Sequence, residues 1–258
     1  MSATLFEPKA ASGLSSLGLT VACERLDQAA QRAAAGQWSY SHFLGYLLDG
    51  ELAERQQRTV ALNLQFARFP AVKRLADFDF KAQPSLDPKL IDELATGRYL
   101  GEGRNVIFLG PPGVGKTHLA IALGVACAEM GHRVYFTSAV ELARKLALAL
   151  AENRLHREMK NFTRPKLLVI DEVGYLALDQ TQASLLFQVI SQRYDTGGSV
   201  VLTSNKAFSD WAHVFNGDAV MASAALDRLL HKASVVNVRG DSYRLRERRK
   251  ARATEDAV

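Results

Sequence analysis

The residues of this chain best suited to chemistry form a glycine-rich run at 110–117 that ends in lysine and threonine. Glycines let backbone N–H groups turn inward around phosphate oxygens, and a helix that starts directly after such a run adds a partial positive charge. In this G-x-x-x-x-G-K-T pattern the lysine can reach the β- and γ-phosphates of a nucleotide, and the threonine hydroxyl can ligate Mg²⁺. We therefore predict a nucleotide site made of Gly110, Pro111, Pro112, Gly113, Val114, Gly115, Lys116, Thr117 and His118, of which His118 is expected to be structural.

Two adjacent carboxylates, Asp171 and Glu172, follow the apolar run Leu167–Ile170. Acids at the carboxyl end of a buried strand are how a second metal ligand is placed beside a phosphate-binding loop. Asp171 would hold Mg²⁺, mostly through its water, whereas Glu172 points elsewhere in a strand and could polarise the attacking water. Adjacent acids at a strand end are commonly just solvated, so this assignment depends on the phosphate-binding loop.

Asn205 follows the apolar run Ser199–Thr203 and could orient the lytic water or touch the γ-phosphate, if this run forms a strand beside the first one. The alternative is a polar turn residue that ends a strand. Asn205-Lys206-Ala207-Phe208 also resembles the guanine-reading motif N-K-x-D, but Phe208 replaces the acid that pairs with guanine. Adenine is therefore favoured over guanine as the base.

Short, β-branched apolar runs alternate with helical stretches from residue 105 onward, as expected for strands that are covered on both faces. The expected strands are Asn105–Leu109, Arg133–Thr137, Lys166–Ile170, Ser199–Thr203 and Ser234–Val238. Helical periodicity between them predicts helices at Thr117–Met130, Val140–Phe162, Thr181–Tyr194 and Ala222–Lys232. This alternation predicts an α/β fold in which a parallel five-stranded sheet is flanked by helices.

The residues before this alternating region predict a small all-helical domain. Apolar periodicity indicates helices at Val21–Ala35 and Tyr40–Phe69, and Gly50 is expected to break or bend the second one. Prolines at positions 70, 84 and 88 punctuate a linker-like segment. We expect an N-terminal domain at residues 1–70, which serves oligomerisation or contact with DNA or a partner. A linker at 71–90, an ATPase domain at 91–240 and a basic tail at 241–258 are expected to follow.

The net charge of the chain is concentrated at its C-terminus. The 258 residues include 32 Lys+Arg and 27 Asp+Glu, a net charge of +5. Seven basic residues against Asp241 and Glu247 between Arg239 and Arg252 account for the same +5, so the rest of the chain is neutral overall. A tail of one sign favours a polyanionic partner, and a solvated, disordered end is equally compatible with the tail alone.

The composition narrows the class of protein and its location. Hydrophobic residues make up 48% and charged residues 23% of the chain, which excludes a mostly disordered chain and a disulfide scaffold. The longest apolar stretches are far shorter than the ~20 residues of a membrane span, and residues 1–11 lack the apolar core of a secretory signal. We therefore predict no membrane partner and a cytoplasmic location. Cys23 and Cys127 are expected to fill core space, and no zinc site is predicted.

Taken together, these motifs resemble the IstB-like ATP-binding proteins, which are helper ATPases of bacterial insertion sequences related to DnaC-type helicase loaders within the AAA+ superfamily. The resemblance rests on G-P-P-G-V-G-K-T-H-L-A at 110–120, I-D-E-V-G-Y-L at 170–176, L-T-S-N-K at 202–206, L-D-R-L-L-H at 226–231 and G-D-S-Y-R-L-R at 240–246. The stretches W-S-Y-S-H-F-L at 38–44 and F-P-A-V-K-R-L-A-D-F-D-F at 69–80 fit as well, so the resemblance runs from about residue 20 to residue 250.

The resemblance implies an AAA+ ATPase that uses ATP and Mg²⁺ and assembles with itself on double-stranded DNA without sequence preference. It further implies delivery of target DNA to a cognate transposase. Asn205 becomes a sensor, and Arg228, by itself an ordinary exposed arginine, becomes a finger that reaches the γ-phosphate bound by a neighbouring subunit. Too little chain follows the last expected strand for the usual C-terminal helical lid, so the adjacent protomer is expected to clamp the nucleotide. Arg244 could stand in for a second sensor arginine.

Candidate DNA contacts lie in the helix expected at Val140–Phe162, where basic residues recur with helical spacing. They are Arg144, Lys145, Arg154, Arg157 and Lys160. Phosphate contacts need such a row of basic side chains rather than a base-reading motif, and related initiator-type ATPases place a DNA-tracking insertion here. The alternative is a solvated helix face, because Glu141, Glu152 and Glu158 are interspersed.

Other functions remain compatible with parts of this pattern. A replicative helicase loader shares the motifs and differs in its partner. A small-molecule kinase shares the phosphate-binding loop, but the pair Asp171 and Glu172 suits water activation and no small lid domain is evident. Another alternative is a scaffold that binds nucleotide with negligible hydrolysis. The complete set of ATPase motifs gives this alternative no support.

Overall fold

The structure, a computed structural model, describes residues 7–243 of the 258. The chain divides into two compact units, Met1–Leu62 and Asn63–Val258. The division falls inside one long helix, α3 (Tyr40–Ala67), and the segments at 71–90 belong to the second unit. The basic tail from Arg244 onward lies outside the described residues.

The first unit is a small helical assembly of α1 (Glu7–Ser16), α2 (Thr20–Ala35) and the first part of α3. Its core is small, with Ala22, Ala29 and Leu47 buried at the centre. The carboxylate of Glu51 accepts hydrogen bonds from the first backbone N–H groups of α2, at 2.9 Å and 3.3 Å. Burial of this acid is thus compensated by the otherwise unpaired donors of a helix end.

The expected break at Gly50 is wrong, because α3 runs through this residue without interruption. A glycine in a helix interior costs only about 1 kcal/mol relative to alanine, which tertiary packing readily offsets. The Arg25 guanidinium packs against the helix at the place that a side chain of residue 50 would take. A Cβ at Gly50 would lie 2.8 Å from it.

The second unit is built on a parallel five-stranded sheet with the strand order β2-β3-β4-β1-β5. The strands are β1 (Asn105–Leu109), β2 (Val134–Ser138), β3 (Leu167–Val173), β4 (Ser199–Ser204) and β5 (Ala233–Asn237). All four neighbouring pairs run parallel. The predicted α/β fold is confirmed, with strand bounds that differ from the expected ones by only a few residues.

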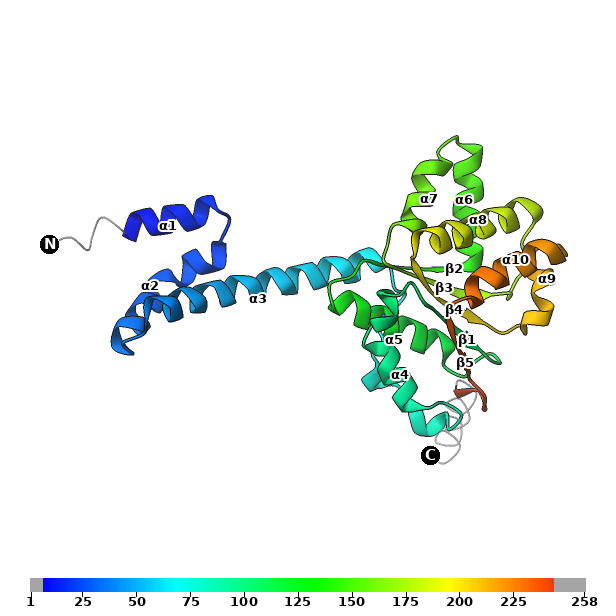
Figure 1. Ribbon diagram of the computed structural model, residues 1–258, viewed down its shortest axis with the longest axis horizontal. Helices are drawn as coiled ribbons and strands as arrows, with labels where there is room; N and C mark the ends of the chain where they lie inside the picture. Colours follow the sequence, from blue (N-terminus) through cyan, green and yellow to red (C-terminus); the bar gives the residue numbers. More distant parts are fainter. Residues whose placement is uncertain (1–6, 244–258) are drawn as a thin grey trace, which may run out of the picture. The chain divides into compact units, whose positions relative to one another are not determined.

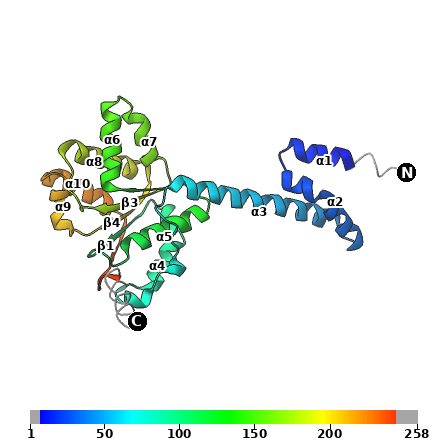
Figure 2. The same cartoon turned by 180° about the vertical axis from the view of Figure 1, so that it is seen from behind.

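Helices cover both faces of this sheet, as Figures 1 and 2 show. They are α4 (Pro88–Ala95), α5 (Lys116–Glu129), α6 (Ala139–Ala151), α7 (Leu155–Thr163), α8 (Gln180–Thr196), α9 (Trp211–Val214) and α10 (Ala219–Leu230). Helices α4 and α5 pack on one face, and α6 to α10 pack on the other. Short 3₁₀ turns lie at η1 (Leu75–Asp77), η2 (Phe80–Ala82), η3 (Arg98–Leu100) and η4 (Phe208–Asp210).

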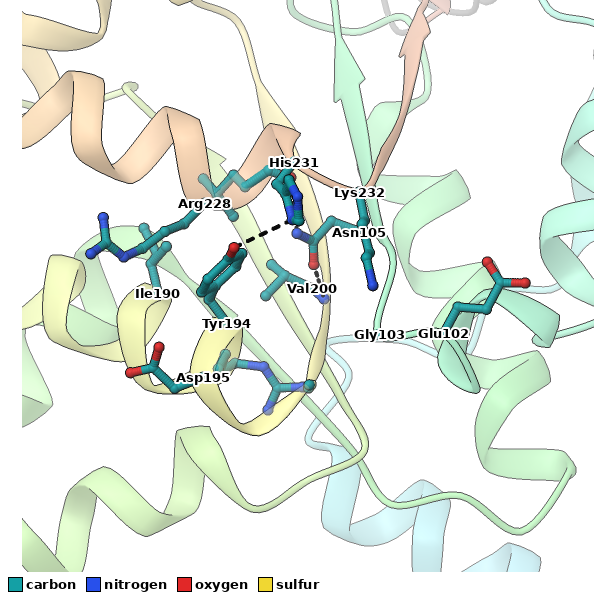
Figure 3. A pocket seen from close by; sticks show the side chains of 14 residues that line it. Glu102, Gly103, Asn105, Ile190, Tyr194, Asp195, Val200, Arg228, His231 and Lys232 are labelled. Carbon is teal, nitrogen blue, oxygen red and sulfur yellow. Dashed lines mark hydrogen bonds between the residues drawn. The ribbon is translucent and has the colours of Figure 1, made fainter.

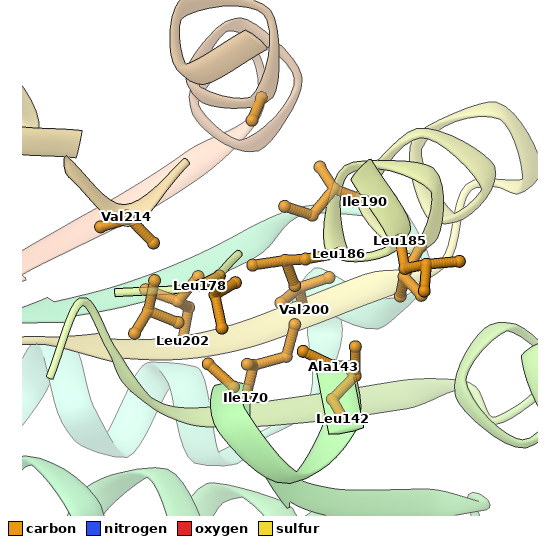
Figure 4. Close-up of a cluster of buried hydrophobic side chains, with 14 of the residues drawn as sticks. Leu142, Ala143, Ile170, Leu178, Leu185, Leu186, Ile190, Val200, Leu202 and Val214 are labelled. Carbon is orange, nitrogen blue, oxygen red and sulfur yellow. The ribbon is translucent and has the colours of Figure 1, made fainter. Parts of the chain in front are cut away.

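Alternate residues of each strand supply the two layers of the core. In β3, Leu167 and Val169 join the layer under α5, while Leu168 and Ile170 join the layer under α6 and α8. Figure 4 shows the second layer, where Ile170 meets Leu142 and other side chains of the facing helices. The continuous apolar runs follow from this burial on both faces.

The single helix expected at Val140–Phe162 is two helices, α6 and α7. Asn153 adopts a left-handed backbone with φ of 56°, and the Arg154 N–H donates to the Ala149 carbonyl oxygen at 2.8 Å. This is the hydrogen bond of a helix that ends at a left-handed residue, a place where asparagine substitutes for glycine. Arg154 therefore precedes α7, whereas Arg157 and Lys160 lie on it.

Candidate nucleotide site

The strand order brings the predicted chemical groups to one edge of the sheet. The phosphate-binding loop leaves the carboxyl end of β1, which pairs with β4, the strand that ends just before Asn205. The acids Asp171 and Glu172 lie in β3, which pairs with the other side of β4. The strand that precedes Asn205 therefore lies beside β1, as the role expected for Asn205 requires. Ligands of open α/β sheets bind outside this carboxyl edge.

The phosphate-binding loop keeps a backbone that requires glycine at two positions. Gly113 and Gly115 have φ of 83° and 97°, in the region that residues with a Cβ rarely adopt. A Cβ at Gly113 would lie 2.2 Å from the Ser242 Oγ, and one at Gly115 would lie 2.7 Å from the Phe78 ring. Val114 between them is fully buried. The loop is thus held closely between the core, an earlier segment at Phe78 and a later one at Ser242.

Lys116 opens α5 and folds its side chain back over the loop. Its Nζ donates hydrogen bonds to the carbonyl oxygens of Gly110 at 2.7 Å and Pro111 at 2.8 Å. The residue is 9% exposed. The ammonium group and the first N–H groups of α5 thus lie at the concave loop, the arrangement that suits bound phosphate.

Asp171 and Thr117, the two residues predicted to hold Mg²⁺, are in contact. The Thr117 hydroxyl donates to the Asp171 Oδ1 at 3.0 Å, and the Thr203 hydroxyl donates to the same oxygen at 2.5 Å. Asp171 is 5% exposed. Carboxylate and hydroxyl oxygens are hard donors of the kind Mg²⁺ takes, so the side chains present fit this ion.

Glu172 departs from regular strand geometry. Its φ is 60°, and the register between β3 and β4 shifts between Ile170 and Val173, as in a bulge. Its N–H donates to the Thr203 Oγ1 at 3.0 Å, and its carbonyl oxygen accepts from the Tyr175 N–H at 3.2 Å. Asp171 is buried, whereas Glu172 is exposed. The two adjacent acids therefore have separate environments.

A cavity of about 250 Å³ opens beside the loop, and sequence reasoning missed the residues outside the loop that line it. They are Lys73, Asp77, Phe78, Asp79, Gln83 and Tyr243, which face 113–118. The Phe78 ring meets the His118 ring edge-on with 5.2 Å between centroids. His118 Nε2 lies 3.0 Å from the Arg74 carbonyl oxygen, which ties α5 to the preceding segment.

The segment after β5 runs back along the phosphate-binding loop. The Val238 N–H donates to the Leu109 carbonyl oxygen at 2.7 Å, and the Tyr243 N–H donates to the Gly113 carbonyl oxygen at 3.0 Å. Gln83 Nε2 donates to the Asp241 carbonyl oxygen at 3.3 Å. Arg244, named as a possible second sensor, lies outside the described residues.

The match with known proteins covers this whole arrangement. Residues 12–251 match the family described as IstB-like ATP binding protein. The chain belongs to this family. It is 44% identical over 233 residues to a protein of insertion sequence IS5376 from Geobacillus stearothermophilus that is named for ATP binding, and the match spans 90% of this chain and 92% of the relative. It is 47% identical over 221 residues to the corresponding IS21 protein of Pseudomonas aeruginosa, spanning 86% and 83% of the two chains.

The solved structures most useful for comparison share the AAA+ fold of this IstB-like protein. The DnaC helicase loader matches with a TM-score of 0.51 and 24% identity over 58% of this chain and 87% of that chain. DnaI matches with a TM-score of 0.55 and 19% identity over 68% and 93%. DnaA bound to AMPPCP and single-stranded DNA matches with a TM-score of 0.54 and 20% identity over 67% and 51%.

Arg228 of this IstB-like protein lies at the opposite edge of its sheet from the phosphate-binding loop. It lines a cavity of about 400 Å³ together with Asn105 and Val200, which begin β1 and β4. Figure 3 shows Arg228 and Tyr194 among the residues that line this cavity, near the start of these strands. Lys116, in contrast, follows the end of β1. The residues that line this cavity with Arg228 thus lie at the amino ends of the strands, whereas the phosphate-binding loop lies at their carboxyl ends.

Three of the five candidate DNA contacts are paired with acids. Glu141 accepts from Arg144 at 2.8 Å and lies 3.4 Å from Lys145, and these cations lower the pKa of its carboxyl group, with the Arg144 hydrogen bond as the main cause. Arg154 pairs with Glu152. Arg157 and Lys160 lie one turn apart on α7.

Two negative findings apply to residues 7–243. No cluster of three or more His, Cys, Asp or Glu side chains within them could hold a metal ion. None of the helices they form is long and apolar enough to cross a membrane.

Proposed function

We propose that this IstB-like protein is an ATPase that assembles with itself on double-stranded DNA without sequence preference and delivers that DNA to a cognate transposase. The observation that carries the hydrolytic part is the contact of Thr117 with Asp171 at the mouth of the loop, with Glu172 turned out of the same strand by a bulge. Relatives named for insertion sequences support the transposition part.

Each side chain at the loop has a distinct role in this proposal. Lys116 exchanges its bonds to Gly110 and Pro111 for bonds to the β- and γ-phosphates. Thr117 and Asp171 hold Mg²⁺, which when bound neutralises charge on the phosphates. Glu172 accepts the proton of the attacking water, because its side chain is exposed beside the loop and accessible to that water. Asn205, exposed at the end of β4, orients that water.

The adjoining cavity suits the adenine base. Its lining places two aromatic rings, Phe78 and Tyr243, together with the Gln83 amide next to the start of α5. Aromatic faces stack on a purine, and an amide can pair with its ring nitrogens and amino group. The replication initiator DnaA, of like fold, has been solved with the ATP analogue AMPPCP.

A second copy completes the site in this proposal. Arg228 lies at the sheet edge away from its own loop, so its guanidinium is available to the γ-phosphate of a neighbour. Such a contact makes nucleotide binding and assembly mutually dependent, because each stabilises the other.

The AAA+ likeness to DnaC and DnaI keeps one alternative in view, a loader of a replicative helicase. That likeness concerns the fold alone. The partner distinguishes the two functions: a loader should co-purify with a helicase ring, whereas a transposition helper should stimulate its transposase. We also propose a cytoplasmic location, which suits a protein that uses ATP and double-stranded DNA and has two free cysteines.

The test is ATP turnover by the full-length protein over a range of its concentration, with and without linear duplexes of two unrelated sequences. We expect turnover per chain to rise with concentration and with either duplex, and sedimentation with a non-hydrolysable analogue to show large DNA-bound species. A protein that stays monomeric and turns over ATP equally fast with and without DNA would refute the proposal.

A further inference from the structure

Two neighbouring hydroxyl groups at the end of β4 contact the bulge that carries the acids, and they do so differently. The Thr203 hydroxyl donates to the Asp171 Oδ1 and accepts from the Glu172 N–H. The Ser204 hydroxyl donates to the Val173 carbonyl oxygen at 2.8 Å and accepts from the Lys206 N–H at 3.1 Å. One hydroxyl therefore links both acids, and the other binds backbone groups of Val173, just past the bulge, and of Lys206, just past β4.

The Thr203 side chain is held firmly enough to act as a reference point. The residue is 1% exposed, and the branch at its Cβ restricts its χ1 angle. Its strand is paired on both sides, with β1 through Phe108 and with β3 through the preceding residues. The oxygen that joins the acids is thus fixed by the centre of the sheet rather than by a loop.

We propose that Thr203 is a positioning residue that sets the Asp171 carboxylate and the Glu172 backbone in one geometry, so that metal binding and water activation are aligned. The inference rests on the proposed ATP hydrolysis and deepens it. It assigns to a β4 side chain a role that the phosphate-binding loop and the acids do not themselves supply.

The first half of this role concerns Asp171. Its Oδ1 accepts from both Thr117 and Thr203. Thr203 is not among the residues proposed to hold the metal, so its bond to the Asp171 Oδ1 does not depend on the Thr117 oxygen that would ligate Mg²⁺. Removal of that donor leaves the buried carboxylate with fewer partners to fix its orientation.

The second half concerns Glu172, whose left-handed backbone is unfavourable for a residue with a Cβ. Such a conformation persists only where neighbours impose it, and the hydrogen bond from its N–H to Thr203 is one of those restraints. Without that bond the bulge is free to relax, and the direction of the Glu172 carboxylate changes with it. The strained backbone is therefore part of how the carboxylate is aimed.

The experiment compares Thr203→Val, which keeps the shape and removes the hydroxyl, with Thr203→Ser, which keeps the hydroxyl. Ser204→Ala is the matched control, because it deletes a buried hydroxyl of the same bulge that binds backbone atoms. Thermal unfolding reports folding, and Thr203→Cys, whose thiol is a weak donor, replaces the valine variant if that variant does not fold.

The first readout does not depend on hydrolysis: it is the gain in affinity for the fluorescent analogue of AMPPCP when Mg²⁺ is added. We expect Thr203→Val to reduce this gain about tenfold while Mg²⁺-free affinity stays within about twofold, and Thr203→Ser and Ser204→Ala to retain it. The second readout is kcat at saturating Mg²⁺ and ATP, which should fall about ten- to a hundredfold in Thr203→Val and recover in Thr203→Ser.

The outcomes separate this inference from the proposed function. If the wild-type protein does not hydrolyse ATP, the proposed ATPase function is wrong. The Mg²⁺-linked gain in affinity then still decides whether Thr203 positions Asp171. If the wild type hydrolyses ATP and Thr203→Val matches it in both readouts, the inference is overturned alone. Equal losses in Thr203→Ser and Thr203→Val would also overturn it, because side-chain shape rather than the hydroxyl would then matter.

Discussion

The Arg228 guanidinium lies over the Phe187 ring, 5.2 Å from its centroid, and donates to the Ala224 carbonyl oxygen at 2.9 Å. An aromatic face and a carbonyl oxygen both attract a cation and leave part of the guanidinium available. The side chain is therefore oriented within its own chain before it meets another molecule.

Mixing two inactive variants should show that Arg228 acts across subunits. Arg228→Ala and Lys116→Ala should each lower ATP turnover at least about a hundredfold, since an arginine finger is worth ~10³–10⁵ in other NTPases. An equimolar mixture should regain part of the turnover, because some sites then combine an intact loop with an intact arginine. Phe187→Leu, which keeps the arginine and removes its ring, should lose less. Turnover in the mixture equal to the mean of the two variants would contradict action in trans.

Replacement of Glu172 by glutamine should separate nucleotide binding from hydrolysis. Glu172→Gln keeps the size of the side chain and removes the proton acceptor, so ATP should bind normally while turnover falls at least about a hundredfold. DNA-bound assemblies should accumulate and be visible by electron microscopy. Turnover at the wild-type rate would show that another group activates the water.

Much of the second unit follows from local sequence pattern, and its exceptions have identifiable causes. The strands are recognisable because each is an apolar run buried on both faces. The helix at 140–162 was mistaken because apolar periodicity continues through Asn153, where a left-handed residue ends α6. Apolar periodicity does not report the backbone angle of a single residue. At Gly50 a break is expected from the sequence and the helix continues, because packing of Arg25 overrides the local preference of glycine against a helix.

The acids Asp171 and Glu172 were found from their place after an apolar run, whereas Thr203 was not. A threonine in a strand is usual, and its importance comes from the pairing of β4 with β3, which no local pattern encodes. The available signal was weak: Thr203 is one of several hydroxyl residues in the stretch S-V-V-L-T-S-N at 199–205. Phe78 and Tyr243 reach one cavity from segments far apart in the chain, so their meeting also depends on the fold.

Affinity for duplex DNA should depend steeply on salt and on α7. Each phosphate neutralised by a basic side chain contributes about 0.9 to the slope of log K against log salt. Arg157→Ala together with Lys160→Ala should lower that slope by about 2, measured by fluorescence anisotropy over a salt series. Arg144→Ala is the control, since its guanidinium is already engaged by Glu141. A flat titration with the wild-type protein would exclude binding through phosphates.

Arg193 should be one of the most sensitive positions for stability. It is fully buried and donates to the carbonyl oxygens of Phe162, Thr163, Pro165, Lys166 and Ser199. Burial lowers its pKa to about 10, so it remains charged at neutral pH. Arg193→Met should cost at least about 3 kcal/mol in urea unfolding, because several buried carbonyl groups lose their donor. Arg193→Lys should recover only part, since an ammonium cannot reproduce the guanidinium fork. A loss below about 1 kcal/mol would contradict this role.

The two cysteines should differ in reactivity. Cys127 is fully buried, and burial raises the pKa of its thiol to about 11, whereas Cys23 is partly exposed. A thiol reagent at pH 8 should label Cys23 in the native protein and Cys127 only on unfolding. Because the folded pKa is the higher one, the contribution of Cys127 to stability is present below about pH 9 and is lost as pH rises through about 11. Rapid native labelling of Cys127, followed by mass spectrometry, would show that α5 opens readily.

The hydrogen bonds of Lys116 to Gly110 and Pro111 bear on how the protein resets. The lysine is held in place by two neutral carbonyl oxygens of its own loop, and charged phosphate oxygens are stronger acceptors that can displace them. In the ATPase proposed above, the loop can therefore keep its shape after product leaves. The next nucleotide then meets a lysine that is already in position.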